Sequence, residues 1–366
     1  MSAPLHIAVA CGGTGGHVMP GLATATALRD RGHRVTLWLT GKALEDQSIA
    51  GWDGPIVRVP AQGLPNRLSW AGIVSAYRIA RAARRCRAIM RTERPDAVLA
   101  MGSYASAGPA WAARRLGIPY VLHEANVIPG RAIRFFARHA AAVACHFEET
   151  RFYLQRGRIV VTGMPLRAEL NPAQAQPLSD LPDVDACTLL IMGGSHGAHA
   201  LNELGTEAVA GITAAGYRIR VLHLTGTADA DWVRDRYAEA GVTAWVRPFA
   251  KQMAGIYQAT TLALCRAGAS TCAELSCFGV PALLVPYPHA ANQHQEANAR
   301  ALEKAGGADV VLESNLTAAW LMDYIKEALD HPKRLARMSA ALKRLTPTSS
   351  ATRLAEVVEA SATASN

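Results

Sequence analysis

Short runs of almost continuous apolar residues alternate with helical stretches along this chain. In the first half the apolar runs are 6–10, 34–39, 97–101, 119–124, 141–146 and 159–163, and a helix is predicted over about 20–31. Strands that are buried on both faces have this near-continuous apolar character. The pattern therefore predicts the α/β class, with a parallel sheet covered by helices on both sides.

The same pattern restarts after a segment without periodicity. Residues 171–185 are rich in Pro and Asp, which indicates a loop at the start of a second domain. Further apolar runs follow, and the C-terminus is helical, with a break at Pro347 and a last helix over about 350–359. The runs are 188–194, 219–226, 243–249, 261–268, 281–288 and 308–313.

The length of the chain also favours two cores. At 366 residues it suits two domains of roughly 150–200 residues each. We expect two Rossmann-like domains facing a central cleft, covering 1–165 and 166–347. We expect the C-terminal helix at about 348–366 to pack back on the first domain.

Each half opens with a strand, a glycine-rich turn and a helix. Gly12–Gly16 and Gly193–Gly197 superpose at an offset of 181 residues. A helix that follows such a turn offers free N–H groups and a positive dipole end, which suit a diphosphate. The alternative is a tight turn that only lets strand and helix pack. The spacing of the glycines is not G-x-G-x-x-G, and the strand at 34–39 is not followed by a ribose-binding acid, which argues against a nicotinamide-dependent dehydrogenase. The motif G-K-[ST] is absent, which excludes a P-loop.

Several side chains near these turns are candidates for chemistry. His17 lies at the mouth of the first turn, where a neutral imidazole can act as a general base, and Thr14 lies beside it. In the second half, Gly268 to Thr271 begin a helix and Glu274 could bind a vicinal diol. Gln295 and Asn298 carry amides that suit sugar hydroxyls. For each of these the alternative is a structural one: a turn contact, a capped helix or a solvated helix face.

Metal and disulfide chemistry have little support. His123 and Glu124 lack further ligands at metal-binding spacing, and the D-x-D pairs at 183–185 and 229–231 lie in polar loops. Seven cysteines without a C-x-x-C pair indicate free thiols in a reducing cytosol. We therefore expect no metal.

The net charge of +9 is concentrated in the first half. Residues 1–165 carry +12 and residues 166–366 carry −3. Nucleic acid is not expected, because the chain has no helix-turn-helix, zinc-finger or RNP-like signature. An anionic membrane surface is the other candidate partner.

A basic amphipathic stretch at 67–91 could supply that membrane contact. Apolar and basic side chains recur there at helical spacing, and 131–138 could extend the patch. The alternative is a helix whose apolar face meets the core and whose charged face is solvated. No apolar run reaches the roughly 18 residues of a membrane span, and we interpret residues 7–11 as a buried strand, not a signal peptide. The candidate membrane residues are Trp70, Ile73, Val74, Tyr77, Arg81, Arg84 and Arg85.

Several specific blocks occur in order between about residues 6 and 345. They are GGTGGHVMPGLA, MGSYASAGPA, GIPYVLHEAN, TGMPLR, IMGGSHGA, CRAGASTCAEL, VPYPHAANQHQEANA and EKAGGA. With these blocks the chain resembles the MurG family, the bacterial UDP-N-acetylglucosamine:lipid I transferases of peptidoglycan synthesis.

The resemblance implies a B-type glycosyltransferase fold, a reaction and a location. The family transfers GlcNAc from UDP-GlcNAc to the C4 hydroxyl of the MurNAc of lipid I (undecaprenyl-diphospho-MurNAc-pentapeptide). The transfer inverts the anomeric centre, uses no metal or cofactor, and forms lipid II. The implied location is peripheral, on the cytoplasmic face of the plasma membrane, with other cell-wall synthesis proteins as further partners. A related B-type transferase with another lipid or polysaccharide acceptor is the alternative.

The resemblance also implies roles for particular residues. The catalytic set is His17, Thr14 and Tyr104, and the acceptor diphosphate would lie at Gly13, Thr14, Gly15 and Gly16. Glu274 would bind the ribose, and Gln295 with Asn126 would bind GlcNAc hydroxyls. The remaining donor-side residues are Thr14, Gly15, Gly16, Arg167, Ser195, Phe249, Met253, Arg266, Gly268, Ala269, Ser270 and Thr271.

Four positions depart from the family's usual pattern. Ser103 replaces the second Gly of G-G-Y, Ala125 the Gln of H-E-Q-N, Met164 the Asn of G-N-P-x-R, and His196 the Gln of G-G-S-Q-G-A. Two amides are thereby lost at 125 and 164, which concerns the acceptor side more than the donor class.

Overall fold

The structure is a computed structural model that divides the chain into two compact units. It describes residues 3–61, 70–154, 157–178, 181, 187–194, 197–345 and 349–364, without the side chains of residues 44 and 70–76. The first unit is Met1–Arg167 together with Pro347–Asn366, and the second is Ala168–Thr346.

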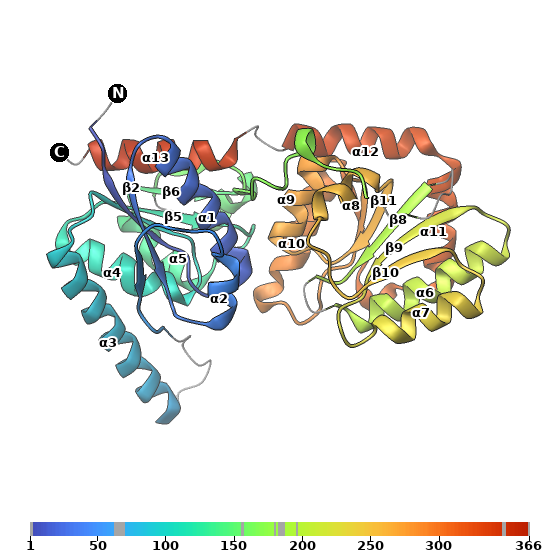
Figure 1. The fold of residues 1–366 in the computed structure, drawn as a ribbon, viewed down its shortest axis with the longest axis horizontal. Coiled ribbons are helices and arrows are strands. Elements are labelled where there is room, and N and C mark those ends of the chain that lie inside the picture. Colours follow the sequence, from blue (N-terminus) through green and yellow to red (C-terminus); the bar gives the residue numbers. More distant parts are fainter. Residues whose placement is uncertain are drawn as a thin grey trace. The chain divides into compact units, whose positions relative to one another are not determined.

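The first unit is built on a seven-stranded parallel sheet in the order β3-β2-β1-β4-β5-β6-β7 (Figure 1). Its strands are β1 (His6–Ala10), β2 (Arg34–Leu39), β3 (Ile56–Arg58), β4 (Ala97–Ala100), β5 (Tyr120–Glu124), β6 (Ala142–Cys145) and β7 (Ile159–Val161). Its helices are α1 (Gly15–Asp30), α2 (Ala43–Ser48), α3 (Trp70–Thr92), α4 (Ala107–Leu116), α5 (Arg131–Phe136) and α13 (Ser350–Thr363), with short 3₁₀ turns η1 (Tyr104–Ser106), η2 (Ala137–His139) and η3 (Glu148–Tyr153).

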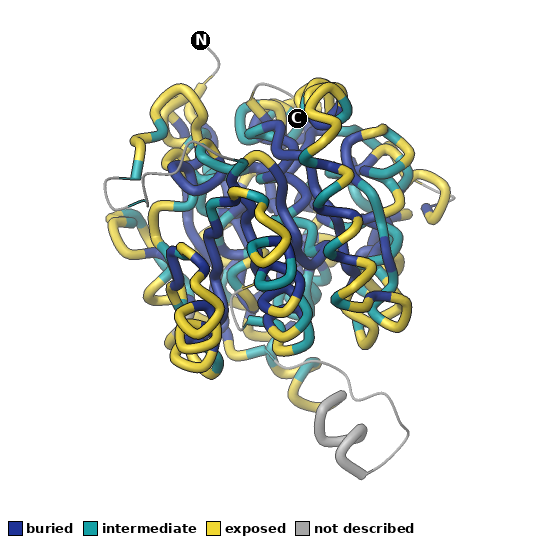
Figure 2. Tube along the Cα trace, turned by 90° about the vertical axis from the view of Figure 1, so that its right-hand side faces the viewer, coloured by how far each residue is buried: buried dark blue, intermediate teal, exposed yellow. Residues whose placement is uncertain are grey.

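Both faces of this sheet are covered, as near-continuous apolar strands require. Alternate residues of a strand point to opposite faces. Ile7 and Val9 join a cluster with α1 and α13, whereas Ala8 joins one with α3 and α4. Figure 2 colours the chain by burial, with buried segments in the interior and exposed residues on the outside.

The second unit repeats this design with a six-stranded parallel sheet in the order β10-β9-β8-β11-β12-β13. Its strands are β8 (Cys187–Met192), β9 (Ile219–Leu224), β10 (Ala244–Arg247), β11 (Leu262–Cys265), β12 (Ala282–Leu284) and β13 (Ala308–Val310). Its helices are α6 (His199–Ala214), α7 (Ala230–Glu239), α8 (Met253–Ala259), α9 (Ala269–Phe278), α10 (His294–Lys304), α11 (Ala318–Asp330) and α12 (Pro332–Leu345), with 3₁₀ turns η4 (Pro172–Gln174), η5 (Ala291–Gln293) and η6 (Glu313–Asn315).

The shared strand order places a topological switch point in each unit. The chain moves outward in one direction from β1 and in the other from β4, and it does the same at β8 and β11. Ligands of open parallel sheets bind beyond the carboxyl ends of the strands at such a point. The predicted α/β class with two parallel sheets is confirmed.

Two helix boundaries differ from those predicted. Helix α1 begins at Gly15, five residues before the expected start at Pro20, so Pro20 lies inside the helix. Its ring removes one backbone hydrogen bond near the N-terminus, and its carbonyl accepts an additional bond from the Thr24 hydroxyl at 2.8 Å. Helix α13 continues to Thr363, four residues past the expected end at Glu359.

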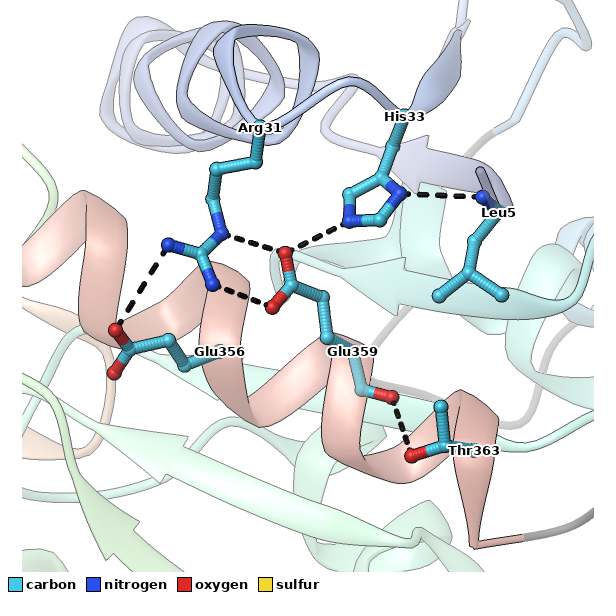
Figure 3. Close-up of polar contacts among 6 residues, drawn as sticks. All are labelled: Leu5, Arg31, His33, Glu356, Glu359 and Thr363. Atoms are coloured by element: carbon cyan, nitrogen blue, oxygen red, sulfur yellow. Dashed lines mark hydrogen bonds and ion pairs between the residues drawn. The ribbon is translucent and has the colours of Figure 1, made fainter. Parts of the chain in front are cut away.

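Polar contacts hold α13 to the start of the first unit (Figure 3). The Glu359 carboxylate accepts from Arg31 Nε at 2.6 Å and Nη2 at 2.7 Å. His33 Nε2 lies 2.8 Å from the same carboxylate, and His33 Nδ1 accepts from the Leu5 N–H at 3.2 Å. Glu356 lies farther away, 4.0 Å from Arg31. Because a backbone N–H can only donate, the proton of neutral His33 is on Nε2 and points at Glu359.

Candidate active site

The first glycine-rich turn links β1 to α1 and holds His17 at the helix N-terminus. Thr14 is the N-cap residue, and its carbonyl accepts from the N–H groups of His17 and Val18. The Thr14 hydroxyl lies 2.9 Å from His17 Nδ1. Burial lowers the pKa of His17 to about 4, so the imidazole is neutral at physiological pH. A β-carbon at Gly12 would lie 2.8 Å from the Thr40 nitrogen, so the turn could not pack here with a larger residue.

A second turn, after β4, packs against the first. Ser103 adopts φ 61°, a conformation that glycine enters far more easily. Its hydroxyl donates to the Gly12 carbonyl at 2.9 Å and accepts from the Ala105 N–H at 3.1 Å. These two bonds offset part of the strain of a non-glycine residue there. Tyr104 follows, and its hydroxyl lies 2.5 Å from Lys42 Nζ.

Buried His123 and half-buried His146 lie at the ends of β5 and β6. Burial lowers the pKa of His123 to about 4 and that of His146 to about 3. His123 Nε2 and both ring nitrogens of His146 have no hydrogen-bond partner among the described residues. His17 contributes to the shift at His123, so these imidazoles belong to the same neighbourhood.

Glu124 organises the turn that follows β5. Its carboxylate accepts from the N–H groups of Asn126 and Gly130, both at 2.9 Å, and from Asn126 Nδ2 at 3.3 Å. Burial raises the pKa of Glu124 above its usual value. The amide expected to meet GlcNAc is thus oriented by Glu124. Arg167, another expected donor-side residue, is half-buried at the end of the first unit's main segment.

The second glycine-rich turn occupies the equivalent place in the second unit. Gly197 N–H donates to the Gly194 carbonyl at 3.0 Å, and a β-carbon at Gly197 would lie 2.1 Å from the Thr225 oxygen. This position therefore accepts only glycine. Ser195 and the departure at His196 lie outside the described residues.

The third predicted turn, between β11 and α9, presents a helix N-terminus. Gly268 is its N-cap residue and Ala269, Ser270 and Thr271 form the first turn, all half-buried. One turn later, the Glu274 carboxylate accepts from the Tyr257 hydroxyl at 2.7 Å. That bond fixes one carboxylate oxygen, as a diol-binding acid requires.

Arg266 points back into its own unit. Its Nη1 donates to the Val285 carbonyl at 3.2 Å, its Nη2 pairs with Glu313, and its guanidinium lies 5.5 Å from the centre of the Tyr287 ring. The side chain expected to border the donor diphosphate therefore braces the loop after β12.

The loop before α10 carries unusual backbone geometry. Asn292 and Gln293 both adopt left-handed conformations, with φ 53° and 54°. Such strain is concentrated at functional sites. Gln295 follows, and its Oε1 accepts from the Tyr287 N–H at 3.0 Å. Asn298 is buried and donates to the Ala267 carbonyl at 3.2 Å, so it supports the α9 turn.

Two expected donor-side residues lie on the connection from β10 to α8. Phe249 is 61% exposed, which is high for an aromatic side chain, and half-buried Met253 begins α8. Tyr257, the partner of Glu274, lies one turn farther along α8.

The helix α3 covers most of the basic stretch and has one buried and one exposed side. Ala83, Cys86 and Met90 are buried on the side that packs against α4. Tyr77 and the guanidinium groups on the other side are exposed, namely those of Arg78, Arg81, Arg84, Arg85 and Arg91. The side chains of Trp70, Ile73 and Val74 lie outside the described residues. Within the described parts of the chain, no helix combines the length and apolar character of a membrane span.

Sequence reasoning missed three residues that shape these turns: Glu45, Lys42 and Tyr257. The absence of an acid directly after β2 argued against a ribose site, yet the Glu45 carboxylate turns back to the end of that strand from α2. Glu45 lies in α2, a helix too short to give a periodic pattern of apolar residues in the sequence. Lys42 acts through Tyr104, which lies 62 positions away, and Tyr257 acts through Glu274, which lies 17 positions away.

Comparisons with known proteins identify the family. Residues 7–145 match the glycosyltransferase family 28 N-terminal domain, and residues 188–356 match the glycosyltransferase family 28 C-terminal domain. A protein of Hahella chejuensis named UDP-N-acetylglucosamine--N-acetylmuramyl-(pentapeptide) pyrophosphoryl-undecaprenol N-acetylglucosamine transferase is 40% identical, over 92% of each chain. A protein of the same name from Geobacter sulfurreducens is 36% identical, over 93% of this chain and 94% of its own. The crystal structure of Acinetobacter baumannii MurG is 28% identical, with a TM-score of 0.81 over 98% of this chain and 100% of that one.

The chain belongs to the MurG family. It is a glycosyltransferase with two Rossmann-like units of the B-type architecture. More distant structures share this fold alone, such as the calicheamicin glycosyltransferase CalG4, which is 17% identical with a TM-score of 0.70.

The departures from the MurG pattern have a structural context in the first unit. Ala125 and Met164 are buried, with 8% and 3% of their surfaces exposed. Apolar side chains at these sites need no hydrogen-bond partner, unlike the amides they replace. Ser103 is retained at a positive φ by its two hydrogen bonds.

Proposed function

We propose that this chain transfers GlcNAc from UDP-GlcNAc to the C4 hydroxyl of lipid I, which gives lipid II and UDP. The observation that carries this proposal is the match to transferases of that name, at 40% and 36% identity over nine-tenths of each chain. The neutral imidazole at the first glycine-rich turn supports it, because a sugar hydroxyl needs a base as it attacks.

On the acceptor side, His17 takes the proton. If its Nδ1–H donates to the Thr14 hydroxyl, which lies 2.9 Å away, the lone pair of Nε2 is free. The acceptor oxygen forms a bond to C1 of GlcNAc as its proton passes to Nε2. The bond from C1 to the β-phosphate oxygen breaks, and its electron pair leaves with UDP. Tyr104 and the Gly13–Gly16 turn border the acceptor and its diphosphate.

On the donor side, the second unit holds the nucleotide. Negative charge grows on the departing diphosphate, and the N-terminus of α9 offers N–H groups and a positive dipole end to it. Glu274, oriented by Tyr257, binds the ribose diol, and Gln295 binds GlcNAc hydroxyls with Asn126. Ser195, Phe249, Met253, Arg167 and the 266–271 segment complete the donor contacts, together with residues 14–16.

The membrane contact belongs to the first unit. We propose that α3 lays its exposed arginines against anionic headgroups, which brings the acceptor turns near a lipid-linked substrate. The protein then works as a peripheral enzyme on the cytoplasmic face of the plasma membrane, where UDP-GlcNAc is available.

The test is a transfer assay with UDP-GlcNAc and a soluble lipid I analogue. We expect UDP release and a product heavier by one GlcNAc only when both substrates are present, and little turnover with UDP-GalNAc. His17→Ala should lower kcat by about 10²–10⁴-fold, the usual contribution of a general base.

His6→Ala is the matched control, because His6 lies at the opposite end of β1 from the turn. It should leave kcat within about twofold. Full turnover by His17→Ala would remove His17 as the base. UDP release without any acceptor requirement would contradict the transferase itself.

A further inference from the structure

Three turns at the carboxyl edge of the first sheet are tied to one another by side chains. They follow β1, β2 and β4, which are neighbours or next neighbours in the sheet. Ser103 ties the β4 turn to the β1 turn through the Gly12 carbonyl, and Lys42 ties the β2 turn to the β4 turn through the Tyr104 hydroxyl. Glu45 forms the third link, between the turns that follow β1 and β2.

Glu45 is a buried carboxylate surrounded by donors. Only 1% of its surface is exposed. Oε1 accepts from the Gly13 N–H at 2.7 Å and from the Thr40 hydroxyl at 2.5 Å. Oε2 accepts from the N–H groups of Thr40 and Gly41, both at 2.8 Å, and of Lys42 at 3.3 Å. Burial opposes ionisation, but these bonds outweigh it and lower the pKa of Glu45.

The bond to Gly13 crosses from one turn to another. Gly13 lies 32 residues before Glu45 and directly precedes Thr14, the partner of His17. Its φ of 127° is one that glycine alone adopts easily. Because glycine adopts many other backbone conformations just as easily, the turn has no intrinsic preference for this one. A charged acceptor that engages the Gly13 N–H supplies that preference.

We propose that Glu45 is a positioning residue for glycosyl transfer: its carboxylate acts as an internal anion that fixes the first glycine-rich turn and so sets the place of Thr14 and His17. This inference rests on the proposed function, because it assigns Glu45 to the acceptor side of that reaction. It also changes the expected role of Gly13, whose N–H is bonded to the protein's own carboxylate. The acceptor diphosphate is then left to the N–H groups that begin α1.

The charge of Glu45, and not merely its shape, carries this role. All five of its bonds come from N–H or O–H donors. A glutamine of the same size must point its NH₂ group at some of these donors, which breaks their bonds. Aspartate keeps the charge but is shorter by one methylene, so it holds only part of the set.

The experiment compares Glu45→Gln, Glu45→Asp and Asp46→Asn. Asp46 is the matched control, since it follows Glu45 on α2 and its carboxylate forms an exposed 2.7 Å ion pair with Arg58. For each protein we would measure kcat/KM for a lipid I analogue at saturating UDP-GlcNAc, kcat/KM for UDP-GlcNAc at saturating acceptor, the Kd of UDP, and hydrogen exchange at Gly13.

Glu45→Gln should lower kcat/KM for the acceptor by about 10–100-fold, the size of effect that a misplacement of about 1 Å produces. The Kd of UDP should change by less than about twofold, Gly13 should exchange faster, and Glu45→Asp should lie between. Asp46→Asn should match the wild type. If Glu45→Gln does not fold, Glu45→Asp must show the same selective loss, and its absence overturns the proposal.

Two outcomes would overturn the inference. One is faster exchange at Gly13 with an unchanged kcat/KM for the acceptor, and the other is an equal loss in acceptor turnover and UDP binding. Failure of the proposed function looks different, because the wild type itself would then transfer no GlcNAc. In that case the Gly13 exchange would still report whether Glu45 fixes the turn.

Discussion

At the scale of single residues, burial rather than residue type sets the chemistry of His17. An exposed histidine has a pKa near 6.5 and is partly charged in the cell. Burial lowers the pKa of His17 to about 4, so almost every molecule carries the neutral form that can accept a proton. The cost is a weaker base, and a bound anionic diphosphate would raise its basicity when both substrates are in place.

This shift predicts the acid side of the pH profile. The neutral imidazole is the active form, and it predominates at every pH above its lowered pKa. Activity is therefore lost as the pH falls towards that pKa. We expect kcat/KM for the acceptor to stay flat from about pH 7.5 down to about 5 and to fall only as the pH approaches 4. A break near pH 6.5 in the profile of stable enzyme would contradict the assignment of His17 as a base with a lowered pKa.

The residues that sequence could predict are those that local motifs bring together. Thr14 and His17 are three positions apart, so the turn alone places them in contact. The bond from Glu45 to Gly13 depends instead on where two separate strands end, which residue spacing does not encode. For Arg266 the resemblance implied a donor contact, which stays a prediction, and the structure adds bonds to the Val285 carbonyl and to Glu313 that residue spacing did not indicate.

At the scale of elements, α3 has two faces in different surroundings. Its buried side packs on α4 through Ala83 and Cys86, and its exposed side presents arginine side chains to solvent. The periodicity of the stretch predicted both faces, but a helix wheel cannot say which charges remain exposed after packing.

Charge reversal on α3 tests its proposed contact with lipid. Arg81→Glu, Arg84→Glu and Arg85→Glu together should weaken binding to vesicles containing phosphatidylglycerol by about 100-fold or more at low salt, since each basic residue near such a surface contributes about 1 kcal/mol. Co-sedimentation measures this. The control reverses Arg234, Arg236 and Arg337 of the second unit, which are also exposed. Equal loss in both triple variants would indicate a net-charge effect and not a docking face.

Helix α1 shows why element boundaries are harder to predict than elements. Four glycines in residues 12–16 favour a turn, and proline favours a helix start, so local preference placed the start at Pro20. In the structure the helix already begins at Gly15, and it is Gly21, farther along, that packs against Cys11 and Met101 at the ends of β1 and β4. The first residues of the helix are the ones that the proposed acceptor site uses.

At the scale of the whole molecule, the restart of the strand pattern predicted two parallel sheets. The strand order that they share, apart from the additional β7 of the first sheet, was not predictable, because apolar runs do not state which strand pairs with which. The residues that bind α13 could not be predicted either, since Arg31 and Glu359 lie 328 positions apart.

The attachment of α13 predicts a selective loss of stability. Glu359→Gln should lower the free energy of unfolding of the first unit by about 1–2 kcal/mol, because it disrupts two charge-assisted bonds and leaves the buried His33 N–H poorly paired. The pKa of Glu359 is lowered, chiefly by Arg31, so this contribution is present above about pH 4.5 and disappears as the pH falls through the folded-state value.

Glu356→Gln is its control on the same helix, as that carboxylate is exposed and lies 4.0 Å from Arg31. It should cost less than about 0.5 kcal/mol. Urea unfolding followed by hydrogen exchange in α1 and α13 separates the first unit from the second. Equal effects of the two variants, or a Glu359→Gln effect that does not shrink as the pH falls below about 4.5, would contradict this account.

The return of α13 to the first unit also determines the order in which the protein can mature on the ribosome. Everything from Ala168 to Thr346 is synthesised between the last strand of the first sheet and the helix that covers its α1 face. At roughly 5–20 residues per second, that interval lasts on the order of 10–40 s. The later unit can therefore reach its folded state while Leu354 and Val358 are still missing from the earlier core. For that period the nascent chain exposes an apolar sheet face, which makes it a client for chaperones.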